Sequence, residues 1–89
     1  MPDYRRRYVP GADYAFTVCL RDWRSDLLVR KIEPLRAAWV EAAARRPFET
    51  IAAVVLPNHL HTIWRMPEGD SDYSTRWADL KAGFTRTAA

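Results

Sequence analysis

Two histidines separated by a single residue, His59 and His61, are the side chains best suited to chemistry in this sequence. On a β-strand, side chains at positions i and i+2 project from the same face, so these two imidazoles could share one metal ion. Arg65 falls on the same face, and its guanidinium is suited to binding a phosphate. The spacing predicts a metal site for phosphate chemistry, and a pair of polar residues on a solvated sheet face is the alternative.

A metal held by the two histidines would need at least one further ligand, because two nitrogens fill only part of a coordination shell. A structural zinc site needs four nitrogen or sulfur ligands, and Cys19 is the only cysteine. A nucleotide-hydrolysing histidine triad would repeat the pattern two residues beyond His61, where the chain has Ile63. Neither of these two classes of site fits the sequence.

The histidines begin a segment, 59–66, that alternates as a half-buried strand does. Its inward face is predicted to carry Leu60, Thr62, Trp64 and Met66. The tight turn Pro57–Asn58 connects it to residues 48–56, which have no charge after Glu49. That composition predicts a central strand buried on both faces.

Three further segments are bounded by prolines and glycines. Residues 14–20 are rich in β-branched and aromatic side chains and predict a first strand. A helix is expected from Pro34 to Arg45, with an inward stripe of Leu35, Trp39, Val40 and Ala43. A last helix is expected from Thr75 to about Arg86, with Ser74 as its N-cap. Residues 22–31 fit either a strand or a helix, so the expected order is β, α, β, β, α.

The composition limits the class of protein. Eighty-nine residues suffice for one domain, 1–89, and 48% hydrophobic residues with 28% charged ones are typical of a folded chain. A single cysteine argues against a disulfide scaffold, and no apolar run reaches the length of a membrane span. We therefore expect a cytoplasmic protein with no membrane partner. The net charge of +3 permits a polyanionic partner without requiring one.

Residues 55–64, VLPNHLHTIW, resemble the His-hydrophobe-His signature of single-tyrosine HUH transposases. Three further stretches resemble the REP-associated tyrosine transposases, a branch of that superfamily. They are Tyr4–Gly11, Arg46–Glu49 and Met66–Trp77. The resemblance covers nearly the whole chain, and the order of the stretches makes chance agreement unexpected.

The resemblance implies an α/β (α+β) fold, with a ferredoxin-like or RRM-like antiparallel sheet and helices packed on one face. It also implies that His59 and His61 hold Mg²⁺ or Mn²⁺, which polarises a phosphate of single-stranded or hairpin DNA. A tyrosine then attacks that phosphate and forms a 5′-phosphotyrosine link. Arg5, Arg6 and Arg7 would help to bind the hairpin, and Arg76 could reach the sheet face, although a solvated helix face is its alternative.

The chain departs from the family in its tyrosines, since Tyr4, Tyr8, Tyr14 and Tyr73 do not match the family's nucleophile. That tyrosine lies well downstream of the histidines, on a helix that also supplies a third metal ligand. We therefore expect this chain to be a truncated amino-terminal portion of such a transposase. It should contain no catalytic residue, should not cleave DNA and should expose apolar surface. The rival hypothesis is a non-catalytic single-strand nucleic-acid binding module with an RRM-like sheet. Trp23 is the one tryptophan not assigned to the core, and it could stack on a base.

Overall fold

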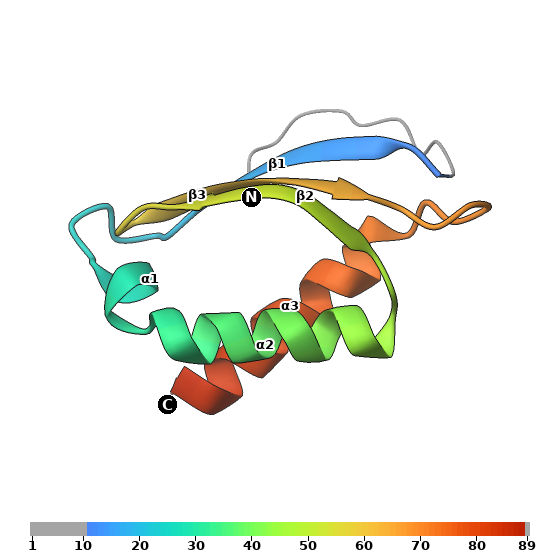
Figure 1. The fold of residues 1–89 in the computed structure, drawn as a ribbon. Coiled ribbons are helices and arrows are strands. Elements are labelled where there is room, and N and C mark those ends of the chain that lie inside the picture. The colour runs from blue at the N-terminus through green and yellow to red at the C-terminus, as the bar shows by residue number, and fades with distance from the viewer. Residues whose placement is uncertain (1–10, 89) are drawn as a thin grey trace.

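The computed structural model describes residues 11–88, in which a three-stranded antiparallel sheet carries helices on one face (Figure 1). The elements in chain order are β1 (Asp13–Cys19), α1 (Leu27–Arg30), α2 (Ile32–Arg45), β2 (Glu49–Val55), β3 (His59–Arg65) and α3 (Tyr73–Ala88). The expected α+β class and the antiparallel sheet with helices on one face are confirmed. Residues 22–31, which the sequence left open, contain the short helix α1.

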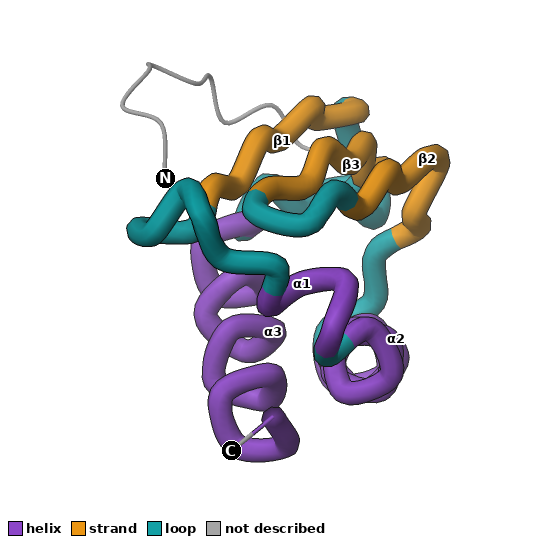
Figure 2. Tube along the Cα trace, turned by 90° about the vertical axis from the view of Figure 1, so that its left-hand side faces the viewer, coloured by secondary structure: helices purple, strands orange, loops and turns teal. Residues whose placement is uncertain are grey.

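Strand β3 is the central strand, because it pairs with β1 on one side and β2 on the other. Its alternation is as predicted: Leu60, Thr62 and Trp64 are buried, and Met66 just beyond the strand is buried too. The opposite face of β3 carries the two histidines. We call that face of the sheet, which no described helix covers, the open face (Figure 2).

The prediction that residues 48–56 form a central strand buried on both faces is wrong. In the described part of the chain strand β2 is an edge strand that pairs only with β3, and six of its seven residues are exposed. Its register against β3 shifts between Thr50 and Ala52, so the extra residue Ile51 forms a bulge. An uncharged apolar run is expected for a doubly covered strand, but here no described element covers the outer side of this strand.

Helix α2 begins near Pro34 and ends at Arg45 as expected, but its inward stripe is rotated from the predicted one. Leu35, Ala38 and Ala42 are buried, whereas Val40 is 66% exposed, so its assignment to the core is wrong. The reason is the close approach of α3: a Cβ added at Gly83 would lie 3.4 Å from Ala38 Cβ. Small residues at this crossing let the two helices pack beneath the sheet (Figure 2).

Helix α3 starts at Tyr73, two residues earlier than the sequence suggested, so Ser74 is not its N-cap. The carboxylate of Asp72 accepts hydrogen bonds from the Thr75 backbone N–H at 3.1 Å and from the Thr75 hydroxyl at 2.7 Å. This is the N-cap geometry, in which the side chain pairs with the third helical residue. An aspartate there also suits the positive end of the helix dipole.

The core between the sheet and the helices is aromatic. Trp64 is fully buried and stacks on Trp77 with ring centroids 4.4 Å apart. Phe16 meets both rings edge-on. The assignment of Trp39, Trp64 and Trp77 to packing is confirmed. Over residues 11–88 the helices are too short or too polar to cross a membrane.

Candidate metal and nucleic-acid site

The two histidines lie together on the open face of β3, as the sequence predicted. Their ring centroids are 5.0 Å apart and the ring planes are nearly perpendicular. His61 is exposed and His59 is half-buried. Both side chains therefore reach solvent from the central strand of the sheet, where an extended nucleic-acid strand could approach them.

Each imidazole has a hydrogen-bonding neighbour at its Nδ1 atom. His59 Nδ1 lies 2.7 Å from Asn58 Oδ1, and His61 Nδ1 lies 3.0 Å from Thr17 Oγ1. Thr17 reaches His61 because the two residues are directly paired across β1 and β3. Such contacts at Nδ1 orient an imidazole and leave Nε2 as the nitrogen that can bind a metal.

The turn that carries His59 is held from the segment following β1. Leu20 N–H donates to Asn58 O at 2.8 Å, and Leu28 N–H donates to Pro57 O at 3.2 Å. The hairpin itself is closed by Leu56 N–H, which donates to His59 O at 2.8 Å. The predicted tight turn at residues 57–58 is therefore present. It is held by backbone hydrogen bonds from Leu20 and Leu28 and by the hydrogen bond that closes the hairpin.

The donor set fits a divalent ion in part. Two imidazole nitrogens on one face can supply two ligands, and Mg²⁺ or Mn²⁺ commonly completes its shell with water and phosphate oxygens. Cys19 pairs with His59 across the strands, yet no group of three His, Cys, Asp or Glu residues suited to a metal occurs within the described chain. The remaining ligands would have to come from outside residues 11–88 or from a substrate.

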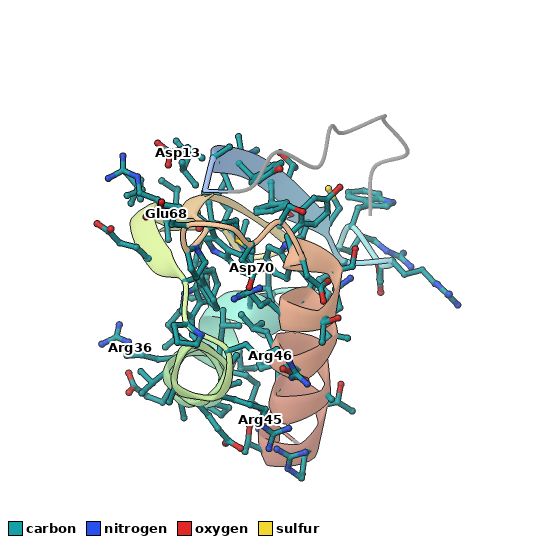
Figure 3. The ribbon with its side chains drawn as sticks, turned by 90° about the vertical axis from the view of Figure 1, so that its right-hand side faces the viewer. Asp13, Arg36, Arg45, Arg46, Glu68 and Asp70 are labelled. Carbon is teal, nitrogen blue, oxygen red and sulfur yellow. The ribbon has the colours of Figure 1, made fainter. Side chains whose placement is uncertain are left out.

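Arg65 lies on the histidine face, as predicted, but at the far end of β3 from His59. Its guanidinium pairs with Asp13 through Nε–Oδ1 at 2.8 Å and Nη2–Oδ2 at 3.1 Å. The hydrogen bond from Arg65 holds the pKa of Asp13 below its ordinary value. Asp13 lies at the edge of the sheet (Figure 3), so a phosphate would have to compete with this carboxylate for Arg65.

Arg76 is buried beside the loop that precedes α3. Its side chain is 3% exposed, so the expectation of a solvated helix face is wrong. The guanidinium bonds Asp70 and the backbone carbonyls of Arg46, Pro47 and Asp72. A DNA contact by Arg76 would require this network to open, and its role in the described structure is to fix the loop before α3.

Neither described tyrosine lies near the histidines. Tyr14 and Tyr73 are both 7% exposed and pack against each other with ring centroids 5.1 Å apart, on the helix side of the sheet. Tyr4 and Tyr8 lie outside the described residues, as do the predicted DNA-binding residues Arg5, Arg6 and Arg7. Both described tyrosines thus lie on the face of the sheet opposite the histidines.

The sequence reasoning missed Asn58 and Thr17 as neighbours of the histidines. Asn58 could have been noticed, because it immediately precedes His59 in a turn, where a short side chain folds back on its neighbours. Thr17 could not, because its contact depends on the register between strands that are 44 residues apart in sequence.

Comparison with known proteins identifies relatives along almost the whole chain. A scan against family models gives no match. The REP-associated tyrosine transposase of Escherichia coli strain K12 is 49% identical over 85 residues, which cover 96% of this chain and 52% of the relative. The chain is homologous to the REP-associated tyrosine transposases.

Two further matches are to proteins of the same name. A Haemophilus influenzae strain Rd relative, which carries the same family name provisionally, is 40% identical over 97% of this chain and 49% of its own length. The solved structure of a REP-associated tyrosine transposase bound to a REP hairpin superposes with a TM-score of 0.90 and 49% identity, over 97% of this chain and 52% of that one. The chain thus spans about half the length of the family members it matches.

Proposed function

We propose that this chain supplies the metal-binding and DNA-binding half of an HUH-class transposase that acts in the cytoplasm on single-stranded DNA hairpins. The observation that carries the proposal is the pairing of His59 and His61 on the open face of the central strand, with Nδ1 of each ring engaged. The relative bound to a REP hairpin makes hairpin DNA the substrate to test first.

The chemistry follows from this arrangement. Two neutral imidazoles would hold Mg²⁺ or Mn²⁺, and the bound ion would supply Lewis-acid polarisation of one phosphodiester. The open face leaves room for a strand to pass over the histidine pair. Binding there would set the phosphate in place, and the basic arm at Arg5, Arg6 and Arg7 would add sequence-independent contacts to the DNA backbone.

Cleavage requires a nucleophile from outside residues 11–88. In the proposed reaction a tyrosine oxygen bonds to phosphorus, the bond from phosphorus to the 3′-oxygen breaks, and that oxygen takes a proton to become a 3′-hydroxyl. Tyr14 and Tyr73 are buried on the opposite side of the sheet, so neither can reach a phosphate held by the histidines. We therefore propose that the 89-residue chain by itself binds DNA and does not cleave it.

The rival RRM-like reading is less well supported. RRM sheets stack bases on aromatic side chains of the exposed sheet face. The open face of the described sheet has no aromatic side chain other than the two imidazoles. Its β1 and β2 residues are Asp13, Ala15, Thr17, Cys19, Glu49, Ala52 and Val54.

Thermal unfolding with and without Mn²⁺ tests the metal site. At Mn²⁺ about tenfold above its Kd, binding to the native state adds about 1.4 kcal/mol, which raises Tm by about 5 to 10 °C for a domain of this size. His59→Ala and His61→Ala should remove the rise. Cys19→Ser is the matched control, because it changes the residue opposite His59 and should keep the rise. An equal rise in all four proteins would refute the proposed site.

A denaturing gel tests the missing nucleophile. The chain is incubated with Mn²⁺ and a labelled single strand that carries a REP-type hairpin, and a native gel is run in parallel. We expect a shifted band on the native gel and no covalent protein–DNA band on the denaturing gel. A covalent band that Tyr73→Phe abolishes would overturn this division of roles.

A further inference from the structure

We infer that Asn58 is a positioning residue for the metal site: by accepting a hydrogen bond from His59 Nδ1, it selects the imidazole tautomer whose Nε2 lone pair faces the metal. The inference deepens the proposed function and rests on it for the identity of the metal. The tautomer itself is a property of the protein without metal, so it can be tested separately.

The argument starts from the Asn58 side-chain amide, which has hydrogen-bond partners at both of its ends. Its Nδ2 group donates to the backbone carbonyl oxygen of Trp23, which can only accept. That contact fixes which end of the amide is nitrogen. The oxygen Oδ1 is then the atom 2.7 Å from His59 Nδ1.

The amide oxygen determines the protonation of the ring. An amide oxygen has no proton to give, so His59 Nδ1 must be the donor. A neutral imidazole carries one N–H, and when that N–H is at Nδ1, the Nε2 atom has a bare lone pair. This is the state that a metal ligand requires, and second-shell contacts of this type tune metal affinity.

Asn58 is itself held in place by backbone contacts. Its carbonyl oxygen accepts from Leu20 N–H at 2.8 Å, and the preceding carbonyl, of Pro57, accepts from Leu28 N–H at 3.2 Å. The side chain and the backbone of this turn are therefore both tied to the segment 20–28. Asn58 is thus held on both its backbone and its side chain while its Oδ1 atom contacts His59.

His61 differs from His59 in this respect. Its neighbour at Nδ1 is the hydroxyl of Thr17, at 3.0 Å, and a hydroxyl can donate or accept. Thr17 therefore does not select a tautomer. We expect His59 to be locked in one tautomer and His61 to sample both when no metal is present.

The test is long-range ¹H–¹⁵N correlation NMR of the ¹⁵N-labelled chain without metal, at alkaline pH where imidazoles are neutral. The cross-peak pattern distinguishes Nδ1–H from Nε2–H rings. Wild type should show His59 as Nδ1–H, and Asn58→Ala should move His59 toward Nε2–H. Asn58→Asp should keep the Nδ1–H form, because a carboxylate also accepts from Nδ1. Thr17→Val is the matched control and should leave His59 unchanged.

The outcomes separate the inference from a merely structural role for the turn. A His59 ring that stays Nδ1–H in Asn58→Ala would overturn the inference, and so would loss of that form in Asn58→Asp with the fold intact. If Asn58→Ala fails to fold, wild type and Asn58→Asp still decide the matter, since an Nε2–H ring in either one contradicts it.

A second readout is Mn²⁺ affinity, measured by calorimetry or by paramagnetic broadening. Asn58→Ala should bind about 10- to 100-fold more weakly than wild type, and Asn58→Asp should recover most of that loss. If wild type binds no Mn²⁺, the proposed metal site is wrong. The NMR measurement without metal then still tests whether Asn58 selects the His59 tautomer. Equal affinity in wild type and Asn58→Ala would overturn the inference.

Discussion

Buried Arg76 forms a two-pronged ion pair with Asp70, with Nη1–Oδ1 at 3.2 Å and Nη2–Oδ2 at 2.9 Å. The same guanidinium donates to the carbonyl oxygens of Arg46, Pro47 and Asp72. Asp70 and Arg46 both lie beside α3 (Figure 3). One side chain on α3 therefore connects the loop that follows β3 to the segment that leads into β2.

Replacing Arg76 should destabilise the fold strongly. Arg76→Met keeps much of the volume but removes every donor, so Asp70 and the carbonyls of Arg46, Pro47 and Asp72 lose these hydrogen bonds. We expect the free energy of unfolding, measured by urea titration, to fall by about 3 kcal/mol. Arg76→Lys should recover only part of this, because an ammonium cannot reproduce the planar fork.

The matched control for that series is Arg30→Met. Arg30 pairs with Asp26 at 3.0 Å on the surface of α1, where both side chains are more than half exposed. An exposed pair is worth about 0 to 1 kcal/mol, so this variant should unfold close to wild type. Equal losses in Arg76→Met and Arg30→Met would contradict the central role of the Arg76 network.

Acidification should destabilise the protein through the same loop. The hydrogen bond from Arg76 holds the pKa of Asp70 below its ordinary value of 3.8, and contacts from Thr75 lower the pKa of Asp72. A carboxyl with a lowered folded-state pKa contributes stability that is fully present above its unfolded pKa. That stability is lost as the pH falls through the folded value, because the unfolded chain then binds more protons.

The measurement for this prediction is the free energy of unfolding between pH 7 and pH 2. Wild type should be level at neutral pH and decline from about pH 4 downward. Asp70→Asn should be less stable at neutral pH and should show a shallower decline, since one of the titrating carboxyls is gone. A decline as steep as that of wild type would show that Asp70 is not a source of the acid sensitivity.

The strand that carries the histidines was predictable because its alternation is local. Leu60, Thr62 and Trp64 recur at every second position, and a single buried face suffices to explain them. The burial of β2 was not predictable in the same way. Its uncharged apolar sequence is typical of a strand covered on both faces. The exposure of a strand also depends on how many strands and layers surround it, and that number cannot be inferred from residues 49–55 alone.

The same limit applies to Arg76 and to Val40. An arginine in the first turn of a helix usually lies in solvent, and only the arrival of the loop at Asp70 and of the carbonyls at Arg46 and Pro47 made its burial favourable. Val40 fits the apolar stripe by spacing, yet the close crossing at Ala38 and Gly83 turned the stripe away from it. Tertiary contacts decided both cases.

Trp23 should report on single-stranded DNA by fluorescence. It is 74% exposed, while Trp64 and Trp77 are buried and Trp39 is partly buried, so an added quencher will act mainly on Trp23. Its carbonyl is bonded by Asn58, the neighbour of His59, so the ring lies in a loop joined directly to the site. A base stacked on an aromatic ring is worth about 1 to 3 kcal/mol.

We therefore expect single-stranded DNA to quench the emission of wild type and to protect it from acrylamide. Trp23→Ala should bind the strand about tenfold more weakly, and Trp23→Phe should retain most of the affinity because it still offers a ring. The guanidinium carbon of Arg24 lies 5.9 Å from the centre of the Trp23 ring, and this cation could also bind a DNA phosphate. All three proteins contain Arg24, so the comparison between them reports on the ring at position 23. Unchanged affinity in Trp23→Ala would exclude stacking at this position.

The exposed edge of β2 should promote self-association. Among residues 11–88 no strand pairs with its outer edge, and Ile51 and Val54 on it are 41% and 55% exposed. Edge strands with apolar side chains pair with other chains unless a charge blocks them. Sedimentation velocity at rising concentration should show wild type associating and Val54→Lys shifted toward monomer. Val40→Lys is the matched control, because it adds the same charge at a 66% exposed valine on α2 and should associate like wild type. If both lysine variants dissociate equally, net charge and not the β2 edge controls association.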